Sequence, residues 1–332
     1  MILLNNLSLF YQKLEEMKQG SNGMNQMQLY ISMFLLMTLW LILQKDAWIS
    51  PNKEQKAQNA EQMLLRNEPT VQDAIRNKSR EKYAIGLALS GGGIKCLCHV
   101  GVLKAMEEEG LKPDVLSGVS AGAVIAALYA DGYSTDSILY IFENIKYSDF
   151  IRLEMPDGGL FTLTGFKEFL DTILRAETFE ELKIPLRVVA TNLEVGKSVV
   201  FDQGPLVDAL VATCSVPILF SPYNIDGVSY VDGGVLQNLP ASVIRPECKY
   251  LIGVSLGPLK TEPYEKSIAN IALRSYKFIF RSNANYDKGL CDMVIEPSAI
   301  SEYNGGDVNR AHEIFIIGYN EAKKMLQLDK KK

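Results

Sequence analysis

The residues with the clearest chemical potential form the stretch Gly118-Val119-Ser120-Ala121-Gly122. This G-x-S-x-G pattern stands between an apolar run and an alanine-rich run, which predicts a serine on a tight turn from a strand into a helix. Gly118 and Gly122 remove side chains that would collide at such a turn. The amino end of the following helix favours negative charge near the serine. The pattern predicts Ser120 as a nucleophile, and the alternative is a helix cap built from small residues.

A second signal is the run Ser90-Gly91-Gly92-Gly93-Ile94-Lys95. The backbone N–H groups of Gly91, Gly92 and Gly93 are unshielded, which suits either a phosphate cradle or an oxyanion hole. A dinucleotide fingerprint needs glycine where Cys96 stands, and the G-K-[ST] ending of a phosphate-binding loop is absent from the sequence. We therefore expect no nucleotide. Lys95 either screens developing charge, contacts an acidic head group or is simply solvated.

A third signal is Asp232-Gly233-Gly234, which follows an expected hairpin. An aspartate before Gly233 and Gly234 can approach another backbone closely. A carboxylate in a partly apolar setting can act as a general base. Taken alone, this motif is better explained by Asp232 as an ordinary turn residue.

Short β-rich runs alternate with helical runs from residue 82 onward, which is typical of a parallel sheet covered by helices. The sequence predicts an α/β fold, a three-layer α/β/α sandwich with a mainly parallel central sheet. Predicted strands span 83–89, 115–119, 186–192, 197–202, 251–256 and 293–295, with a hairpin at 224–230. Predicted helices cover 97–106 and then 121–130, 136–145, 166–174, 205–213, 268–280 and 308–326.

The first 80 residues read as an N-terminal extension, and residues 81–332 as the domain that carries the three signals. Residues 20–44 contain no charge, and residues 29–43 are densely apolar. A membrane segment at about 25–44, followed by a polar linker, is one interpretation of this pattern. A packed helix, or a chain that starts later at an internal methionine, is the other.

Composition narrows the choice of partners and cofactors. The chain has 34 basic and 39 acidic residues and a net charge of −5, so it lacks the basic excess that nucleic-acid binding needs. Five cysteines without a CxxC pair argue against disulfides and a zinc site, and favour a reducing, cytoplasmic compartment. With only His99 and His312, a multi-histidine metal site is excluded. We expect no metal and no organic cofactor.

The three signals together resemble the patatin-like phospholipase family, which carries a glycine-rich loop, a G-x-S-x-G elbow and a D-G-[GA] motif in this order. Further stretches that resemble the family are 201–206, 212–217 and 234–240, and the resemblance runs from about residue 83 to about 256. One departure is Cys96, which stands where the family usually has glycine. None of residues 1–80 takes part in the resemblance.

The resemblance implies a patatin-like fold and a serine lipid acyl hydrolase that works through a Ser-Asp dyad and an acyl-enzyme, in lipid catabolism or membrane lipid remodelling. It implies Ser120 as nucleophile, Asp232 as base and the amides of Gly91, Gly92 and Gly93 as oxyanion donors. The implied partners are a lipid acyl ester and a membrane surface. Independently of the resemblance, the uncharged N-terminal segment would, as an anchor, tether the domain to the cytoplasmic face of a membrane. Two alternatives stay open: a Ser-Asp-His triad through His312, and a catalytically weakened module that binds lipid or protein.

Overall fold

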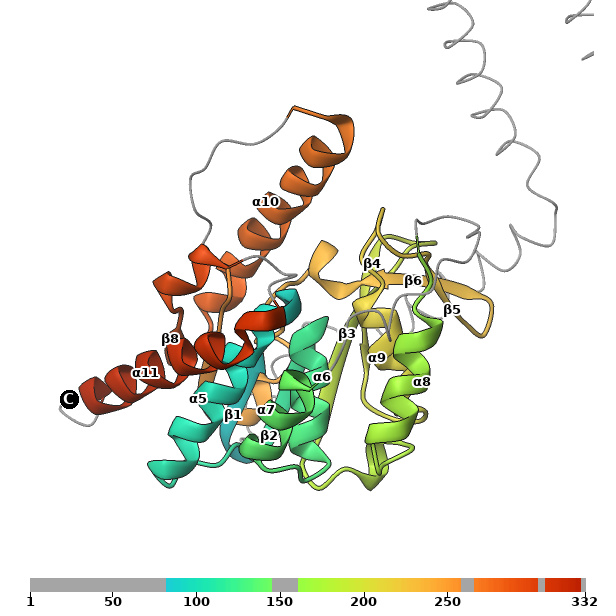
Figure 1. Ribbon diagram of the computed structural model, residues 1–332. Helices are drawn as coiled ribbons and strands as arrows, with labels where there is room; N and C mark the ends of the chain where they lie inside the picture. Colours follow the sequence, from blue (N-terminus) through green and yellow to red (C-terminus); the bar gives the residue numbers. More distant parts are fainter. Residues whose placement is uncertain (1–81, 145–160, 258–265, 304–307, 330–332) are drawn as a thin grey trace, which may run out of the picture. The chain divides into compact units, whose positions relative to one another are not determined.

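The computed structural model describes residues 82–144, 161–257, 266–303 and 308–329. Within these residues the strands form one mixed sheet (Figure 1). The strands are β1 (Tyr83–Leu89), β2 (Val115–Val119), β3 (Leu186–Asn192), β4 (Lys197–Phe201), β5 (Tyr223–Ile225), β6 (Val228–Asp232), β7 (Cys248–Val254) and β8 (Met293–Ile295). Their order is β5-β6-β3-β2-β1-β7-β8, with β4 also paired to β3.

The sheet has a parallel part and an antiparallel edge. Strands β3, β2, β1, β7 and β8 run parallel to their neighbours, whereas β4 and β6 run antiparallel to β3, and β5 antiparallel to β6. The carboxyl ends of parallel strands meet at one edge of the sheet, which is where α/β proteins bind ligands. The turns after β1 and β2, which carry the glycine run and Ser120, therefore lie at the same edge.

Helices cover both faces of the sheet. They are α5 (Leu97–Glu108), α6 (Ala121–Ala130), α7 (Thr135–Glu143), α8 (Thr164–Ile173), α9 (Leu206–Cys214), α10 (Ile268–Lys288) and α11 (Ala311–Asp329). Short 3₁₀ turns include η2 (Gly93–Cys96), η5 (Gly233–Val235) and η8 (Val308–Arg310). One large apolar core joins the sheet to α5, α6, α7, α9 and α11. A smaller core on the other face joins it to the 239–251 segment and to Ala284 of α10.

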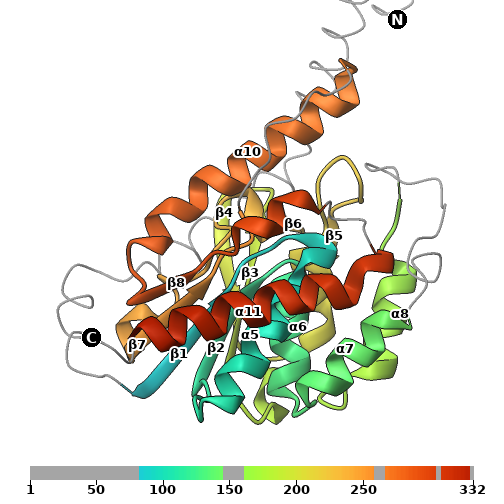
Figure 2. The same cartoon turned by 60° about the vertical axis from the view of Figure 1, so that its left-hand side comes forward.

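Helix α11 lies directly across α5 on the outside of the larger layer (Figure 2). The two helices touch through glycines on each side. A Cβ added at Gly101 would lie 2.0 Å from the Phe315 carbonyl oxygen, and one added at Gly318 would lie 2.0 Å from the Cys98 carbonyl oxygen. Only residues without a side chain allow backbones to approach so closely.

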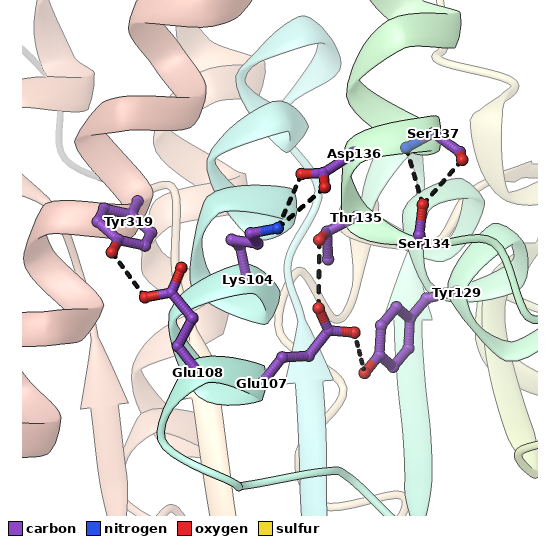
Figure 3. A network of polar contacts seen from close by, with 9 residues as sticks. All are labelled: Lys104, Glu107, Glu108, Tyr129, Ser134, Thr135, Asp136, Ser137 and Tyr319. Atoms are coloured by element: carbon purple, nitrogen blue, oxygen red, sulfur yellow. Dashed lines mark hydrogen bonds and ion pairs between the residues drawn. The ribbon is translucent and has the colours of Figure 1, made fainter.

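Polar contacts fix the far end of α5, opposite the glycine run (Figure 3). Glu107 accepts hydrogen bonds from the Tyr129 hydroxyl at 3.0 Å and the Thr135 hydroxyl at 3.2 Å. Lys104 pairs with Asp136 at 2.9 Å, and Tyr319 donates to Glu108 at 2.7 Å. These contacts join the carboxyl-terminal half of α5 to α6, α7 and α11.

The structure confirms the predicted three-layer fold with a mainly parallel sheet, and differs most at α10. The prediction ended this helix at 280, but it continues to Lys288. Residues 281–288 lack the apolar periodicity of a packed helix, because the polar Asn283 and Asp287 face the domain. In the structure these two side chains form hydrogen bonds with the 234–242 segment. The last predicted helix starts with the 3₁₀ turn η8 and ends at Asp329 rather than 326.

The predicted membrane segment at 25–44 lies outside the described residues. Among the helices that the structure describes, none combines the length and the apolar character that crossing a membrane requires.

Candidate active site

Ser120 occupies the turn between β2 and α6, as the G-x-S-x-G pattern predicts. Its backbone has φ 52° and ψ −136°, a left-handed conformation that is strained for a residue with a side chain. The surrounding structure holds it there: the Ser120 amide donates to Thr213 Oγ1 at 2.8 Å, and that hydroxyl donates to the Val189 carbonyl at 2.5 Å. The side chain is buried, with 6% of its surface exposed.

The two motif glycines around Ser120 are required by close backbone contacts. A Cβ at Gly118 would lie 2.5 Å from Ala123 Cα, because α6 folds back onto the end of β2. A Cβ at Gly122 would lie 2.4 Å from the Ser90 carbonyl oxygen. The elbow is therefore packed against the start of the glycine run with no room for a side chain.

The glycine run passes beside the predicted nucleophile. A Cβ at Gly91 would lie 3.1 Å from Ser120 Cβ, so the two backbones are neighbours. The Gly91 amide, however, donates to the Asn238 carbonyl at 3.3 Å. The amides of Gly92 and Gly93 have no hydrogen-bond partner within the described residues. Of the three predicted oxyanion donors, these two are open to a ligand in this structure.

Cys96 does not disturb the loop. Its φ of −57° and ψ of −19° are ordinary helical values that any residue adopts, so the conformation does not need the glycine that the family usually has here. Its side chain is buried, and burial raises the pKa of its thiol to about 12. Lys95 lies on the same 3₁₀ turn and its side chain is partly exposed.

Asp232 ends β6 and is fully buried. Its Oδ1 accepts a hydrogen bond of 2.7 Å from the Gly234 amide. Its Oδ2 is buried without a hydrogen-bond partner in the described part of the chain. Burial raises the pKa of the carboxyl to about 7, while the neighbouring Ser120 hydroxyl and the Gly234 amide act in the opposite direction. The fold thus places Asp232 beside Ser120 and leaves one carboxylate oxygen able to accept a proton.

The glycines after Asp232 are also set in close contacts. A Cβ at Gly233 would lie 2.1 Å from the Val189 carbonyl oxygen, and one at Gly234 would lie 2.7 Å from the Phe280 ring. Val189 is the same residue whose carbonyl accepts from Thr213. The strand β3 thus supports both the serine turn and the aspartate turn.

Neither histidine contacts Ser120 or Asp232. His312 lies on α11, its side chain is 68% exposed, and its Nδ1 lies 3.2 Å from Glu143 of α7. His99 is buried in α5, where its Nε2 lies 2.8 Å from the Ser90 carbonyl oxygen and must therefore carry the proton. Burial lowers the pKa of His99 to about 4. The Ser-Asp-His triad through His312 is therefore not assembled in this structure.

The structure adds residues to which sequence reasoning gave no role. Thr213 holds the Ser120 amide, and the thiol of Cys214 lies near Ser120 and Asp232, with its pKa raised by burial and by the charge of Asp232. Tyr276 of α10 has a buried hydroxyl without a partner among the described residues. Asn238 positions Gly91. Thr213, Cys214 and Asn238 could have been found from the sequence, because they lie in the family-like stretches 212–217 and 234–240. Tyr276 lies in no such stretch.

No group of three or more His, Cys, Asp or Glu side chains within the described residues could hold a metal ion. The chemistry that this arrangement can perform uses an alcohol nucleophile, a carboxylate base and backbone N–H donors. Those are the components of covalent acyl transfer.

Comparison with known proteins agrees with this geometry. Residues 87–244 match the patatin-like phospholipase family. The uncharacterized NTE family protein Rv1063c of Mycobacterium tuberculosis is 30% identical over 64% of this chain and 59% of its own length. YqhO of Bacillus subtilis is 32% identical over 54% of this chain and 74% of its own length. Patatin-like phospholipase domain-containing protein 7 of Rattus norvegicus is 30% identical over 52% of this chain and 14% of its own length.

The fold and these matches together define an α/β protein with the patatin fold, a mainly parallel sheet flanked by helices. The chain belongs to the patatin-like phospholipase family. It spans about three fifths of the length of the mycobacterial relative and about one seventh of the rat relative.

Proposed function

We propose that this protein hydrolyses acyl esters of lipids through Ser120 and Asp232. The observation that carries the proposal is the position of the Ser120 side chain beside the buried Asp232 carboxyl, whose pKa of about 7 suits a general base near neutral pH. The strained backbone of Ser120 adds support, because strain of this kind is retained at sites where function requires it.

In the first half of the reaction, Ser120 Oγ attacks the ester carbonyl carbon while Asp232 accepts the serine proton. The carbonyl oxygen becomes an oxyanion, and the free amides of Gly92 and Gly93 lie in the loop that would bind it. The intermediate then expels the alcohol, which takes the proton from Asp232. An acyl group remains on Ser120.

In the second half, water attacks the acyl carbon and gives a proton to Asp232. Collapse of the second intermediate releases the fatty acid, and the proton returns to Ser120 Oγ. Each residue ends in its starting state, and no step requires a metal or organic cofactor.

A fluorophosphonate probe tests the nucleophile directly, because it phosphonylates an activated serine. We expect the full chain to be labelled, Ser120→Ala not to be labelled, and Asp232→Asn to be labelled at least about 100-fold more slowly. Ser198→Ala and Asp226→Asn are matched controls, because both residues are exposed on the antiparallel edge of the sheet. Labelling that survives in Ser120→Ala would refute the proposal.

The same variants are then assayed on a panel of phospholipids, lysophospholipids and short-chain esters. Activity on none of them, together with retained lipid binding, would favour the alternative of a weakened binding module. Loss of activity in both dyad variants, each of which still unfolds in one cooperative transition, would support the dyad.

We also propose that residues 1–80 are an extension that tethers the domain of residues 81–332 to the cytoplasmic face of a membrane. The uncharged residues 20–44 and the unpaired cysteines support this proposal. Full-length protein should sediment with membranes and remain there after a high-salt wash. Full-length protein found wholly in the soluble fraction would contradict it.

A further inference from the structure

Helix α10 presents an apolar stripe to solvent. Ile271 and Phe278 are seven residues apart, as are Ile279 and Tyr286, so all four project from one side of the helix. Phe278 is 50% exposed and Ile279 is 48% exposed, and Ile271 and Tyr286 are exposed as well. Figures 1 and 2 show the amino-terminal part of α10 projecting beyond the sheet and the other helices of the domain.

A basic stripe runs along one flank of this apolar stripe. Arg274, Arg281 and Lys288 are also spaced by seven residues, and Lys277 lies beside them. Lys277 and Arg281 form no ion pair with any described residue, whereas Lys288 pairs with Glu296. Within α10 the only acidic side chain is the buried Asp287, although the whole chain has a net charge of −5. The positive charge on α10 is therefore a local feature.

The inner side of α10 is joined to the loop that follows Asp232. Asn283 donates to the Gly234 carbonyl at 2.7 Å and accepts from the Asn238 amide at 2.9 Å. Phe280 packs on Gly234, and the Tyr276 ring lies 4.1 Å from the Phe280 ring. A surface that binds the outer side of α10 would therefore lie about one helix diameter from the loop that follows Asp232.

We propose that α10 docks this protein on an anionic lipid surface, with Ile271, Phe278, Ile279 and Tyr286 among the acyl chains and Lys277 and Arg281 on the lipid head groups. An apolar stripe with a cationic flank on one helix is the pattern that lies in a membrane interface. Anionic lipids attract cations close to the surface, which supplies the charge complementarity. The inference rests on the proposed function, because docking serves a site whose substrate is a lipid.

The first experiment places a reporter on the apolar stripe of the full chain. Phe278→Trp is titrated with vesicles of phosphatidylcholine containing phosphatidylglycerol, and wild-type emission is subtracted because Trp40 and Trp48 also fluoresce. We expect the emission of the added tryptophan to shift to the blue and to be quenched by brominated acyl chains. Leu328→Trp on α11, an equally exposed position, should show neither effect.

Three other results of this fluorescence experiment would overturn the docking proposal. An unchanged emission of the added tryptophan on anionic vesicles overturns the proposal. A blue shift that depends on protein concentration without lipid overturns it in favour of a second copy of the chain. Emission already blue-shifted at every dilution without lipid overturns it in favour of coverage by residues 1–81 or another part of the same chain.

The second experiment separates docking from chemistry. Lys277→Glu with Arg281→Glu should lower the hydrolysis of phospholipid in anionic vesicles at least about tenfold and leave hydrolysis of a dissolved short-chain ester within about twofold. Lys324→Glu with Leu328→Ser, on the exposed side of α11, is the matched control and should change neither rate.

The two experiments distinguish the failure of docking from the failure of the proposed function. If the wild type hydrolyses neither substrate but the added tryptophan still enters vesicles, the proposed function fails and docking stands. If the wild type hydrolyses both substrates and the α10 variants behave like it, docking fails and the proposed function stands.

Discussion

The α-carbon of Gly122 faces the carbonyl oxygen of Ser90 so closely that a Cβ at Gly122 would lie 2.4 Å from that oxygen. The same Ser90 carbonyl accepts the hydrogen bond of His99, and the Ser90 hydroxyl accepts from the Leu256 amide at 2.9 Å. The Ser90 amide also donates to the Val254 carbonyl of β7 at 3.1 Å, so Ser90 connects the serine elbow, the glycine run and the end of β7. This contact fixes the spacing between the nucleophile and the amides of Gly92 and Gly93.

Gly122→Ala should therefore damage the site even though Gly122 takes no part in the chemistry. The new methyl group must push the Ser90 carbonyl away, because no conventional Cβ contact is this short. We expect a destabilisation of about 1–3 kcal/mol and a loss of esterase activity of at least about tenfold. Gly289→Ala is the control, since its new Cβ would lie 3.3 Å from the Tyr286 carbonyl oxygen and needs a shift of only a few tenths of an ångström. Full activity of Gly122→Ala would show that this spacing does not matter.

The rate of ester hydrolysis should rise with pH around an apparent pKa near that of Asp232, which burial raises to about 7. Below that pH the carboxyl is protonated and cannot accept the serine proton, and above it the carboxylate is the major form. The measurement is kcat/KM for a neutral short-chain ester from about pH 5 to 9. A profile that stays flat through neutral pH would exclude Asp232 as the titrating base.

Asp232→Asn should be more stable than the wild type at alkaline pH. The folded protein holds the Asp232 proton up to a pH of about 7, while the unfolded chain releases it near the ordinary value of 3.8. Since the folded state binds more protons in this window, this group makes stability fall as pH rises through it. Asparagine has no charge to bury, so the gain should reach a few kcal/mol at pH 8.

Thermal melts of both proteins at about pH 5 and pH 8 test this prediction, because the difference in melting temperature should grow between the two pH values. Asp226→Asn provides the control, since Asp226 lies in an exposed hairpin turn. Equal melting temperatures of Asp232→Asn and wild type at both pH values would show that the Asp232 carboxyl is not held in a destabilising environment.

The two histidines should respond differently to substitution by alanine. His312→Ala should keep both activity and stability, because its side chain is exposed and contacts only Glu143 among the polar partners described. His99→Ala should keep most activity but lose about 1–3 kcal/mol of stability, because the buried Ser90 carbonyl loses its hydrogen bond. Denaturant titrations and ester assays on both variants measure this. An activity loss in His312→Ala as large as in Ser120→Ala would restore the triad.

Local sequence patterns were sufficient to predict the backbone structure around Ser120. The glycines at 118 and 122 predicted a strand-to-helix turn at Ser120, and β1, β2, β3 and α6 begin and end where their patterns predicted. Such features are encoded within a few residues, because glycine content and apolar periodicity act on the backbone locally. The order of the motifs was enough to identify the family.

Which of these residues come into contact depends on how the strands and helices assemble. The pairing of β6 with β3 places Asp232 beside Ser120, and the same packing removes the solvent that would keep its pKa low. The Gly91 amide donates a hydrogen bond to the Asn238 carbonyl, and His312 lies away from the site on α11. Helix α10 continues to Lys288 because its inner face carries polar residues that bond to the domain. Burial and hydrogen bonds between distant segments exist only after the strands are assembled, so no local pattern records them.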